Sequence, residues 1–341
     1  MVQCSVIADQ GGLVRLRTRD VFTTMRPDLL RVERRVEQAA TVDFPVVSSL
    51  VLELVRAGGK RLRPLVLLLA GRAYAPDPDV LTAAAAGIEL LHTASLVHDD
   101  TVDRSSLRRG RPTLNSMLTA GSVILLGDYL FAQSAMLAAA TQSPRAVTIF
   151  ASTLADICDG QLREIFDAHR LDQSRGDYER RIYGKTASLF AGAAEMGALL
   201  SHAPESHIAA LRAYGSDIGL AFQVIDDILD LREATDDLGK PAGNDLRQGT
   251  VTLPTMIYAA RLDERSAAAA RLRAVVQGEN ESAEAIDEVV HEIRASSALA
   301  ETTAYAVELT ERAKAHVRIC PDQETRSMLE DVADLVWNRS A

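Results

Sequence analysis

Apolar residues recur at helical spacing along most of the chain, and short polar segments interrupt them. Residues 46–57 are apolar on all but one side and end at Gly58-Gly59, a pair suited to a left-handed helix end. From Asp79, a residue type that caps helix N-termini, a long apolar helix is predicted to run to about Val102. Strand-like alternation does not compete with this pattern, so the sequence predicts an all-α protein.

Further helices are predicted after the long one, and three polar, charged segments separate them. These segments, residues 104–112, 171–185 and 232–253, are where we expect chemistry, because functional residues concentrate on loops held by a rigid scaffold. The further helices are 116–141, 146–168, 186–202, 205–231, 252–262, 267–277 and 282–295, with two more before the end.

The composition of the chain favours helix over sheet, and its length limits the number of domains. Hydrophobic residues make up 47% of the 341 residues, aromatic residues only 4%, and alanine-rich runs recur. This length allows one large helical domain or two smaller ones. We expect residues 1–28 to form a flexible N-terminal tail, because glycine and polar residues interrupt any signal-peptide core there, and residues 29–341 to form one helical domain.

The net charge of −10 excludes a global positive field for nucleic acid or anionic lipid. The three cysteines form no CxxC pair, which argues against a disulfide framework or a zinc site and fits a cytoplasmic protein.

Residues 116–140 approach the apolarity of a membrane span. Because Asp128 lies in the middle of this run, we predict instead a buried helix with one inward carboxylate.

An acidic motif occurs twice. In the first copy, Asp99 and Asp103 are four residues apart, so on a helix they share one face. In the second, Asp226 and Asp230 have the same spacing within an apolar helix. Facing carboxylates repel unless they share a proton or a hard cation. A single copy would fit a solvated helix end, but two copies, each followed by a basic loop, indicate a highly anionic ligand held partly by magnesium and partly by Arg or Lys.

Two more basic segments accompany the acidic motifs. Residues 58–64, Gly-Gly-Lys-Arg-Leu-Arg-Pro, lie where one helix ends and the next begins, so their cations and a helix N-terminus could meet a diphosphate. A helix end with solvated cations is the alternative. Gly184-Lys185-Thr186 opens a helix but has too little glycine before it to be a Walker A loop, and alone it fits a plain loop-to-helix junction better than a binding site.

The order of these motifs resembles that of the trans-polyprenyl diphosphate synthases. The motifs that carry the resemblance, together spanning residues 46–254, are Gly-Gly-Lys-Arg-Leu-Arg-Pro, residues 91–100 ending in His-Asp-Asp, Arg108-Arg109-Gly110, Gly184-Lys185-Thr186 and residues 222–227 ending in Ile-Asp-Asp. The resemblance implies a single all-α bundle of the isoprenoid synthase type around a central cavity. It also implies a magnesium-dependent prenyltransferase that joins isopentenyl diphosphate to an allylic diphosphate, head to tail.

The resemblance also implies roles for individual residues. Asp99, Asp103 and Asp226 would ligate Mg²⁺, three ions in all with bound diphosphate, while the other motif carboxylates, Asp100, Asp227 and Asp230, would act through water or behind the ligands. Isopentenyl diphosphate would be held by Lys60, Arg63, His92 and Arg109. The allylic diphosphate would be held by Arg108, Lys185, Thr186, Gln223 and Lys240. One departure is Thr250, where many members of the family carry lysine, which weakens any cation expected in that loop.

Product length is expected to follow from the wall of the helix before the first acidic motif. The pocket is predicted to be lined by Ile88, Leu91, Ala94 and Ser95. In families of this kind small side chains one turn before the motif permit long products, so a chain of thirty carbons or more is predicted. A twenty-carbon product is the alternative, with Tyr129 or Phe131 as the floor.

Rival functions are a class I terpene cyclase, which needs only one diphosphate substrate, and a noncatalytic subunit of a heteromeric synthase, which would be expected to have lost metal ligands. All six motif aspartates are present. The resemblance further implies a homodimer. The sequence shows no basic amphipathic helix, so at most peripheral membrane contact is expected.

Overall fold

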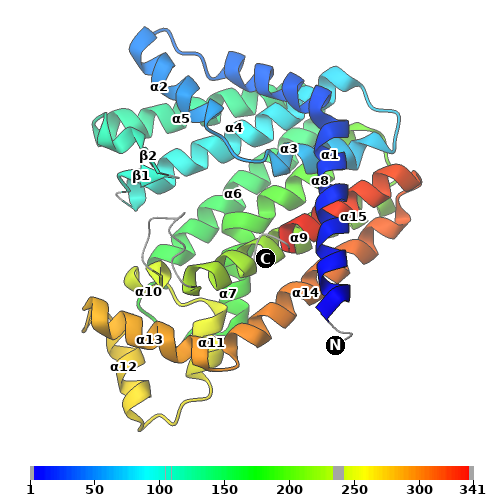
Figure 1. Cartoon of the computed structure of the whole chain (residues 1–341). Helices are drawn as coiled ribbons and strands as arrows, with labels where there is room; N and C mark the ends of the chain where they lie inside the picture. Colours follow the sequence, from blue (N-terminus) through cyan, green and yellow to red (C-terminus); the bar gives the residue numbers. More distant parts are fainter. Residues whose placement is uncertain (1–3, 104, 109, 233–241, 338–341) are drawn as a thin grey trace. The chain divides into compact units, whose positions relative to one another are not determined.

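The computed structural model describes residues 4–103, 105–108, 110–232 and 242–337, with their side chains from residue 21 onward. The chain divides into two compact units. Unit 1 comprises Met1–Ala155, Leu189–Ser216 and Ala313–Leu335, and unit 2 comprises Asp156–Ser188, Asp217–Arg312 and Val336–Ala341. Each unit is described by itself below, with the element labels of Figure 1.

The N-terminal part of unit 1 is built on α4 (Pro78–Val102), which packs along α5 (Ala120–Ala139) and against α1 and α3. Asp77 begins α4 by accepting a hydrogen bond from the backbone amide of Asp79 at 2.9 Å, two residues before the cap that the sequence indicated. The other elements are α1 (Cys4–Ala39), α2 (Pro45–Arg56), α3 (Leu62–Arg72), β1 (Leu107–Arg108), β2 (Arg111–Pro112) and a 3₁₀ turn (Leu114–Ser116).

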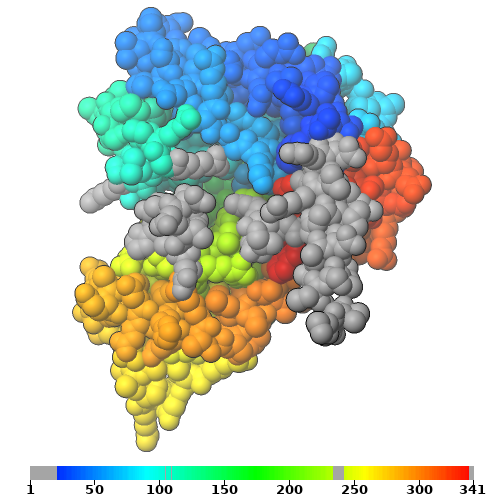
Figure 2. Space-filling view, viewed as in Figure 1, coloured from blue at the N-terminus to red at the C-terminus, as the bar shows by residue number. Residues whose placement is uncertain are grey.

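Several helices have residues in both units, among them α6 (Pro144–Phe166), α9 (Glu205–Leu231) and α14 (Ala298–His316). In unit 2, α12 and α13 enclose an aliphatic core with α11, and they form the yellow and orange surface of Figure 2. The remaining elements are α7 (Arg175–Ile182), a π-helical turn (Tyr183–Ala187), α8 (Ser188–Leu200), α10 (Asn244–Arg247), α11 (Leu253–Ala259), α12 (Ala267–Val276), α13 (Ala283–Ala295), a 3₁₀ turn (Val317–Ile319) and α15 (Gln323–Trp337).

The all-α fold is confirmed, but the structure differs from the sequence expectations in three places. The segment expected as a tail belongs to α1, in which Val21 and Met25 are buried. The polar segment 171–185 contains α7, because Ser174 and Asp177 form a capping box that starts a helix with little apolar periodicity. Asp128 does not point inward. Its side chain is 57% exposed, 3.4 Å from His98.

Two helices, α4 and α5, are long and apolar enough to cross a membrane by length and composition alone. The apolar stretch of α4 is 78% buried inside the protein, which is typical of a core helix. The corresponding stretch of α5 is only 33% buried. The side chains of Leu125 and Met136 are prominent on its exposed face.

Candidate active site

A pocket of about 440 Å³ in unit 1 is lined by Asp100 of the first acidic motif and by basic residues near it. Its walls come from α2, the loop before α3, one face of α4 and the β1–β2 hairpin. It is lined by Leu50, Glu53, Leu54, Ala57, Gly58, Gly59, Arg61, Glu89, His92, Thr93, Leu96, Asp100, Arg108, Arg111, Pro112, Thr113, Leu114 and Met117.

The contribution of α4 to this pocket is a stripe of residues three or four positions apart. Glu89, His92, Leu96 and Asp100 lie on this stripe, as helical geometry requires for side chains that share a face. Asp100 is buried and accepts a hydrogen bond from Arg108 Nε at 2.8 Å. Asp100 and Arg108 both line this pocket and both belong to the predicted site, and in the structure they are paired with each other.

The residues predicted to hold isopentenyl diphosphate are partly brought together. A guanidinium nitrogen of Arg63 lies 3.1 Å from Nε2 of His92, and the guanidinium also lies 4.5 Å from the centre of the Phe190 ring. Lys60 is exposed in the loop before α3. Arg109, the fourth residue of the predicted set, lies outside the described residues.

The residues predicted to set product length are buried on α4 but do not line the unit 1 pocket. Ile88, Leu91 and Ala94 are completely buried, and Ser95 donates to the backbone carbonyl of His92 at 2.8 Å. Of the two proposed floor residues, Phe131 packs edge-on against the ring of His98 with centroids 5.0 Å apart. The other, Tyr129, donates to the carbonyl of Thr41 at 2.8 Å.

In unit 2, the middle carboxylate of the second motif is enclosed by hydrogen bonds. Asp227 is 2% exposed and accepts from the Tyr178 hydroxyl at 2.6 Å and from Gln223 Nε2 at 3.0 Å. Burial raises the pKa of Asp227 to about 6, although these two hydrogen bonds and Arg181 favour the charged form. Both carboxylate oxygens have protein partners, which leaves Asp227 suited to organising the motif.

The last carboxylate of the second motif holds the following loop. Asp230 accepts the backbone amides of Asn244 and Asp245, each at 3.1 Å. Exclusion of water, together with the neighbouring charges of Asp230 and Asp227, raises the pKa of Asp245 well above its ordinary value. Thr250 donates its backbone amide to the carbonyl of Asp245 at 2.8 Å, and Lys240 lies outside the described residues.

The Gly-Lys-Thr segment forms the π-helical turn between α7 and α8. The backbone of α6 lies so close that a Cβ on Gly160 would be 2.2 Å from the Lys185 nitrogen, so glycine is needed there. Lys185 forms an ion pair with Glu164 of α6. Thr186 donates to Gln223 Oε1 at 2.8 Å, which connects this turn to the Asp227 network on α9. Short π-helical turns are frequent at functional sites.

Sequence reasoning missed several residues that organise the two motifs. Tyr178 and Arg181 lie in the segment predicted as a loop, and Glu164 lies within a predicted helix without a motif. Arg61 was grouped with the cationic cluster, yet it is buried and paired with Glu89 at 2.6 Å. A charged residue on the apolar face of a predicted helix, as Glu89 is, was the signal that could have found this pair.

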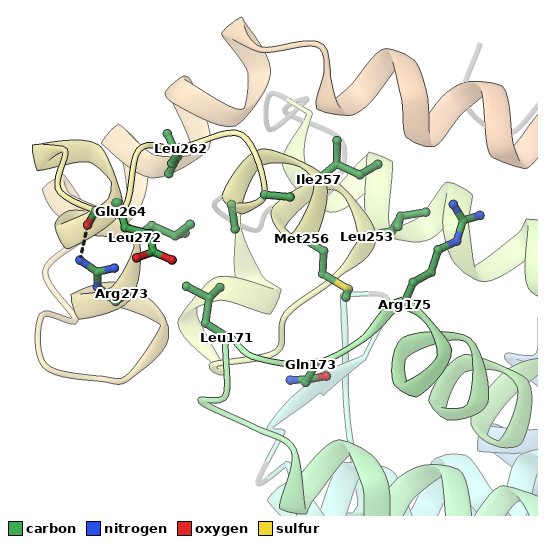
Figure 3. Close-up of a pocket in the computed structure, with 13 residues that line it drawn as sticks. Leu171, Gln173, Arg175, Leu253, Met256, Ile257, Leu262, Glu264, Leu272 and Arg273 are labelled. Carbon is green, nitrogen blue, oxygen red and sulfur yellow. Dashed lines mark hydrogen bonds between the residues drawn. The ribbon is translucent and has the colours of Figure 1, made fainter.

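A second pocket, of about 490 Å³, lies in unit 2 and has a different character. Figure 3 shows Leu171, Leu253, Met256 and Leu272 around it, with Arg273 hydrogen-bonded to the Glu264 backbone carbonyl. Its lining is mainly aliphatic, and none of the predicted site residues belongs to it. It is therefore separate from the residues to which chemistry was assigned.

The donor chemistry of both motifs fits magnesium. Each motif offers carboxylate oxygens four residues apart near a helix C-terminus: Asp99 on α4 with Asp103 at its C-cap, and Asp226 and Asp230 on α9. Within the described residues, no group of three or more His, Cys, Asp or Glu side chains gathers to enclose an ion by itself. Magnesium commonly binds through one or two carboxylates together with substrate phosphates, so a full protein cage is not required.

Comparison with known proteins decides the family, because the polyprenyl synthetase family model matches residues 45–293. The chain belongs to the polyprenyl synthetase family. It is therefore a trans-prenyltransferase of the polyprenyl diphosphate synthase type, and the resemblance inferred from the motifs is confirmed.

Relatives along nearly the whole chain agree with this assignment. The chain is 38% identical over 324 residues to heptaprenyl diphosphate synthase component 2 of Geobacillus stearothermophilus, covering 95% of this chain and 99% of the relative. It is 35% identical to nonaprenyl diphosphate synthase of Mycobacterium tuberculosis, with coverages of 92% and 93%. A decaprenyl diphosphate synthase structure from Rhodobacter capsulatus matches with a TM-score of 0.89 and 34% identity, covering 95% and 99% of the two chains.

Proposed function

We propose that this prenyltransferase condenses isopentenyl diphosphate with an allylic diphosphate, head to tail, and repeats the step to give an all-trans polyprenyl diphosphate of thirty carbons or more. The observation that carries the proposal is the pairing of Arg63 with His92 beside Asp100 and Arg108. Cations that could hold a diphosphate near the first acidic motif support the proposal. Relatives named as heptaprenyl and nonaprenyl synthases support the long product.

In the proposed reaction the allylic C–O bond breaks, and the double bond of isopentenyl diphosphate attacks the resulting carbocation to form a C–C bond. A proton is then lost to the released diphosphate, so no side chain has to act as nucleophile. Arg63, His92 and Lys60 would orient isopentenyl diphosphate, while Arg108 and Lys185 would hold the leaving diphosphate. The buried apolar wall of α4 would exclude water from the cation.

Magnesium, held by Asp99, Asp103 and Asp226, would neutralise charge that develops on the leaving diphosphate. A Caulobacter crescentus polyprenyl synthase structure complexed with calcium and isoprenyl diphosphate, at a TM-score of 0.89 and 34% identity, supports a divalent cation beside the substrate in a similar fold. We propose three ions with bound diphosphate for this chain.

The proposal is tested by incubating purified protein with labelled isopentenyl diphosphate, magnesium and each allylic primer in turn, and resolving the products by length. We expect products of thirty carbons or more that disappear with EDTA. A stop at twenty carbons would retain the reaction and refute the long product. No incorporation with any primer would refute the proposal and favour a cyclase or a partner-dependent subunit.

The product-length assignment has its own test in Ala94→Phe. Ala94 is completely buried on α4, so a phenyl ring there would occupy the space proposed for the growing chain. We expect shorter products with incorporation retained. Ala151→Phe is a matched control, because Ala151 is an exposed alanine on α6. Product lengths that are unchanged in Ala94→Phe would show that the pocket lies elsewhere.

We also propose a homodimer that uses the exposed apolar face of α5. Leu125 is 70% exposed and Met136 is 64% exposed, and contiguous apolar surface of this kind marks interaction sites. The name of the Geobacillus relative, component 2, points to a heteromeric assembly as the alternative. Light scattering of the purified chain, together with its activity alone, separates the two: a monomer that is inactive by itself would refute the homodimer.

A further inference from the structure

Arg61 lies in the middle of the basic loop before α3, but its side chain turns into the protein. One guanidinium nitrogen donates to Glu89 Oε1 at 2.6 Å, and the other terminal nitrogen donates to the backbone carbonyl of Val55 at 2.6 Å. Nε adds a longer contact of 3.4 Å to Glu33 of α1. Arg61 therefore joins α1, the end of α2 and α4.

The backbone of the loop is shaped around this side chain. Arg61 has φ of 51°, a left-handed conformation that is uncommon for a residue other than glycine. Such a conformation persists where surrounding contacts determine it. A Cβ on Gly58 would lie only 1.9 Å from a terminal nitrogen of Arg61, so the first glycine of the motif makes room for the guanidinium.

The pair links the two parts of the predicted isopentenyl diphosphate site. Arg61 is flanked in the chain by Lys60 and followed two residues later by Arg63. Its partner Glu89 lies one helical turn before His92 on the same face of α4, and both residues line the unit 1 pocket. A contact between Arg61 and Glu89 therefore fixes the distance between the basic loop and the His92 side chain.

The charge of Arg61 is balanced by the carboxylate of Glu89. The side chain of Arg61 is 8% exposed and that of Glu89 is 6% exposed, so each charge in this dry environment depends on the other. A guanidinium that is neutralised by a buried carboxylate and bonded to a carbonyl is poorly placed to bind a diphosphate. Arg61 thus differs from Lys60, which is exposed in the same loop.

We propose that the buried Arg61–Glu89 pair is a positioning device for isopentenyl diphosphate: it sets the loop that carries Lys60 and Arg63 against His92 and does not itself bind substrate. This inference rests on the proposed function, because it assigns that substrate to the Arg63–His92 site. Within one basic motif, Arg61 would therefore position the loop while its neighbour Lys60 would contact the substrate.

The test compares Arg61→Met and Glu89→Gln with the unmodified protein and with Arg56→Met. Arg56 is the matched control, since it also forms a two-point ion pair with a glutamate, Glu37, but lies 62% exposed at the end of α2. We expect Arg61→Met to raise KM for isopentenyl diphosphate about tenfold, because a displacement of about 1 Å weakens a positioned site strongly. The KM for the allylic substrate should stay within about twofold of the unmodified value.

Calorimetric binding of isopentenyl diphosphate alone should weaken by the same factor as KM rises. Glu89→Gln should raise this KM about threefold, because a neutral amide still accepts a hydrogen bond from Arg61. Arg56→Met should leave both KM values unchanged. Arg61→Lys retains a charge that can meet Glu89 but cannot also reach the Val55 carbonyl, and we expect an intermediate value; with Glu89→Gln it carries the test if Arg61→Met does not fold.

The proposal is overturned if the Arg61 and Glu89 variants lower the melting temperature while KM for isopentenyl diphosphate stays at the Arg56→Met value. It is equally overturned if KM rises by the same factor for both substrates, which would indicate general loosening of the site. Failure of the unmodified protein to incorporate or bind isopentenyl diphosphate would instead refute the proposed function. The two failures are therefore distinguishable.

Discussion

The two acidic motifs have the same spacing but are stabilised by their surroundings in different ways. In the first, at the end of α4, Asp100 pairs with Arg108 from a short hairpin, and the Arg108 side chain is 34% exposed. In the second, at the end of α9, Asp227 is enclosed by Tyr178 and Gln223, and Asp230 holds two backbone amides. Identical sequence spacing thus coexists with an ion pair whose arginine is partly exposed in one unit and a buried hydrogen-bond network in the other.

This difference suggests that the first motif acts mainly in substrate binding and the second mainly in holding the structure of the site. Arg108 lies at a pocket edge with its side chain partly exposed, so it can exchange its contact with Asp100 for a substrate contact more easily than a buried donor can. A buried network whose acceptors are all satisfied resists such exchange, because breaking it leaves unpaired polar groups. We therefore expect the first motif to respond to substitution mainly in substrate affinity and the second mainly in stability, except at the proposed metal ligands themselves.

The largest expected effect is common to both motifs. Asp99→Asn and Asp226→Asn should each lower kcat by at least about 100-fold, because each removes a carboxylate proposed to hold the metal that would stabilise the leaving diphosphate. Steady-state rates at saturating magnesium measure this. Asp79→Asn, at the exposed start of α4, is the control and should retain full activity. Near-normal activity in one variant would remove that motif from the metal site.

Next in size is Tyr178→Phe, which removes a donor from the second motif. Tyr178 is completely buried, so we expect its loss to lower the free energy of unfolding by about 1–3 kcal/mol, with Asp227 left short of a partner. Urea unfolding measures the change. Tyr305→Phe is matched to it, since Tyr305 also donates to a carboxylate, that of Glu179, but in a partly buried place. Equal losses in both variants would contradict the distinction between the motifs.

Arg108→Gln tests the first motif and should affect stability less. Glutamine retains a hydrogen-bond donor for the buried Asp100, so we expect a loss of about 1 kcal/mol in the free energy of unfolding. The KM for the allylic diphosphate should rise severalfold, while the KM for isopentenyl diphosphate changes little. A large loss of stability without a change in either KM would place Arg108 in a supporting role like that of Tyr178.

The smallest effect concerns the start of α7, the helix that carries Tyr178. Hydrogen bonds from Ser174 lower the pKa of Asp177 to about 2 from the ordinary value of 3.8. A lowered carboxyl pKa means that the ionised cap stabilises the fold above about pH 4, and this contribution is lost as the pH falls toward 2. Asp177→Asn should therefore melt at a slightly lower temperature than the unmodified protein at pH 7, and the difference should close between pH 4 and pH 2. A constant difference across this range would refute the cap.

The sequence predicted most of the helices and the residues of the motifs because both depend on local spacing. Apolar periodicity located α9 with its observed bounds, and two aspartates four residues apart necessarily share a helix face. Apolar periodicity did not predict α7, because the residues of this helix are mostly polar. A capping box starts the helix instead. The pairing of Tyr178 with Asp227 could not be predicted either, because these residues are distant in the chain and their contact depends on tertiary packing.

The π-helical turn at Tyr183–Ala187 changes the phase between α7 and α8. A regular α-helix advances by about 100° per residue, and a π turn adds one residue to a turn without an equal advance in rotation. The side chains of α7 and α8 therefore do not follow one continuous helical periodicity. Lys185 and Thr186 lie in the turn where the periodicity changes. Removing a single residue from this segment would turn Tyr178 away from Asp227, so the number of residues between them matters to the site as much as their identity.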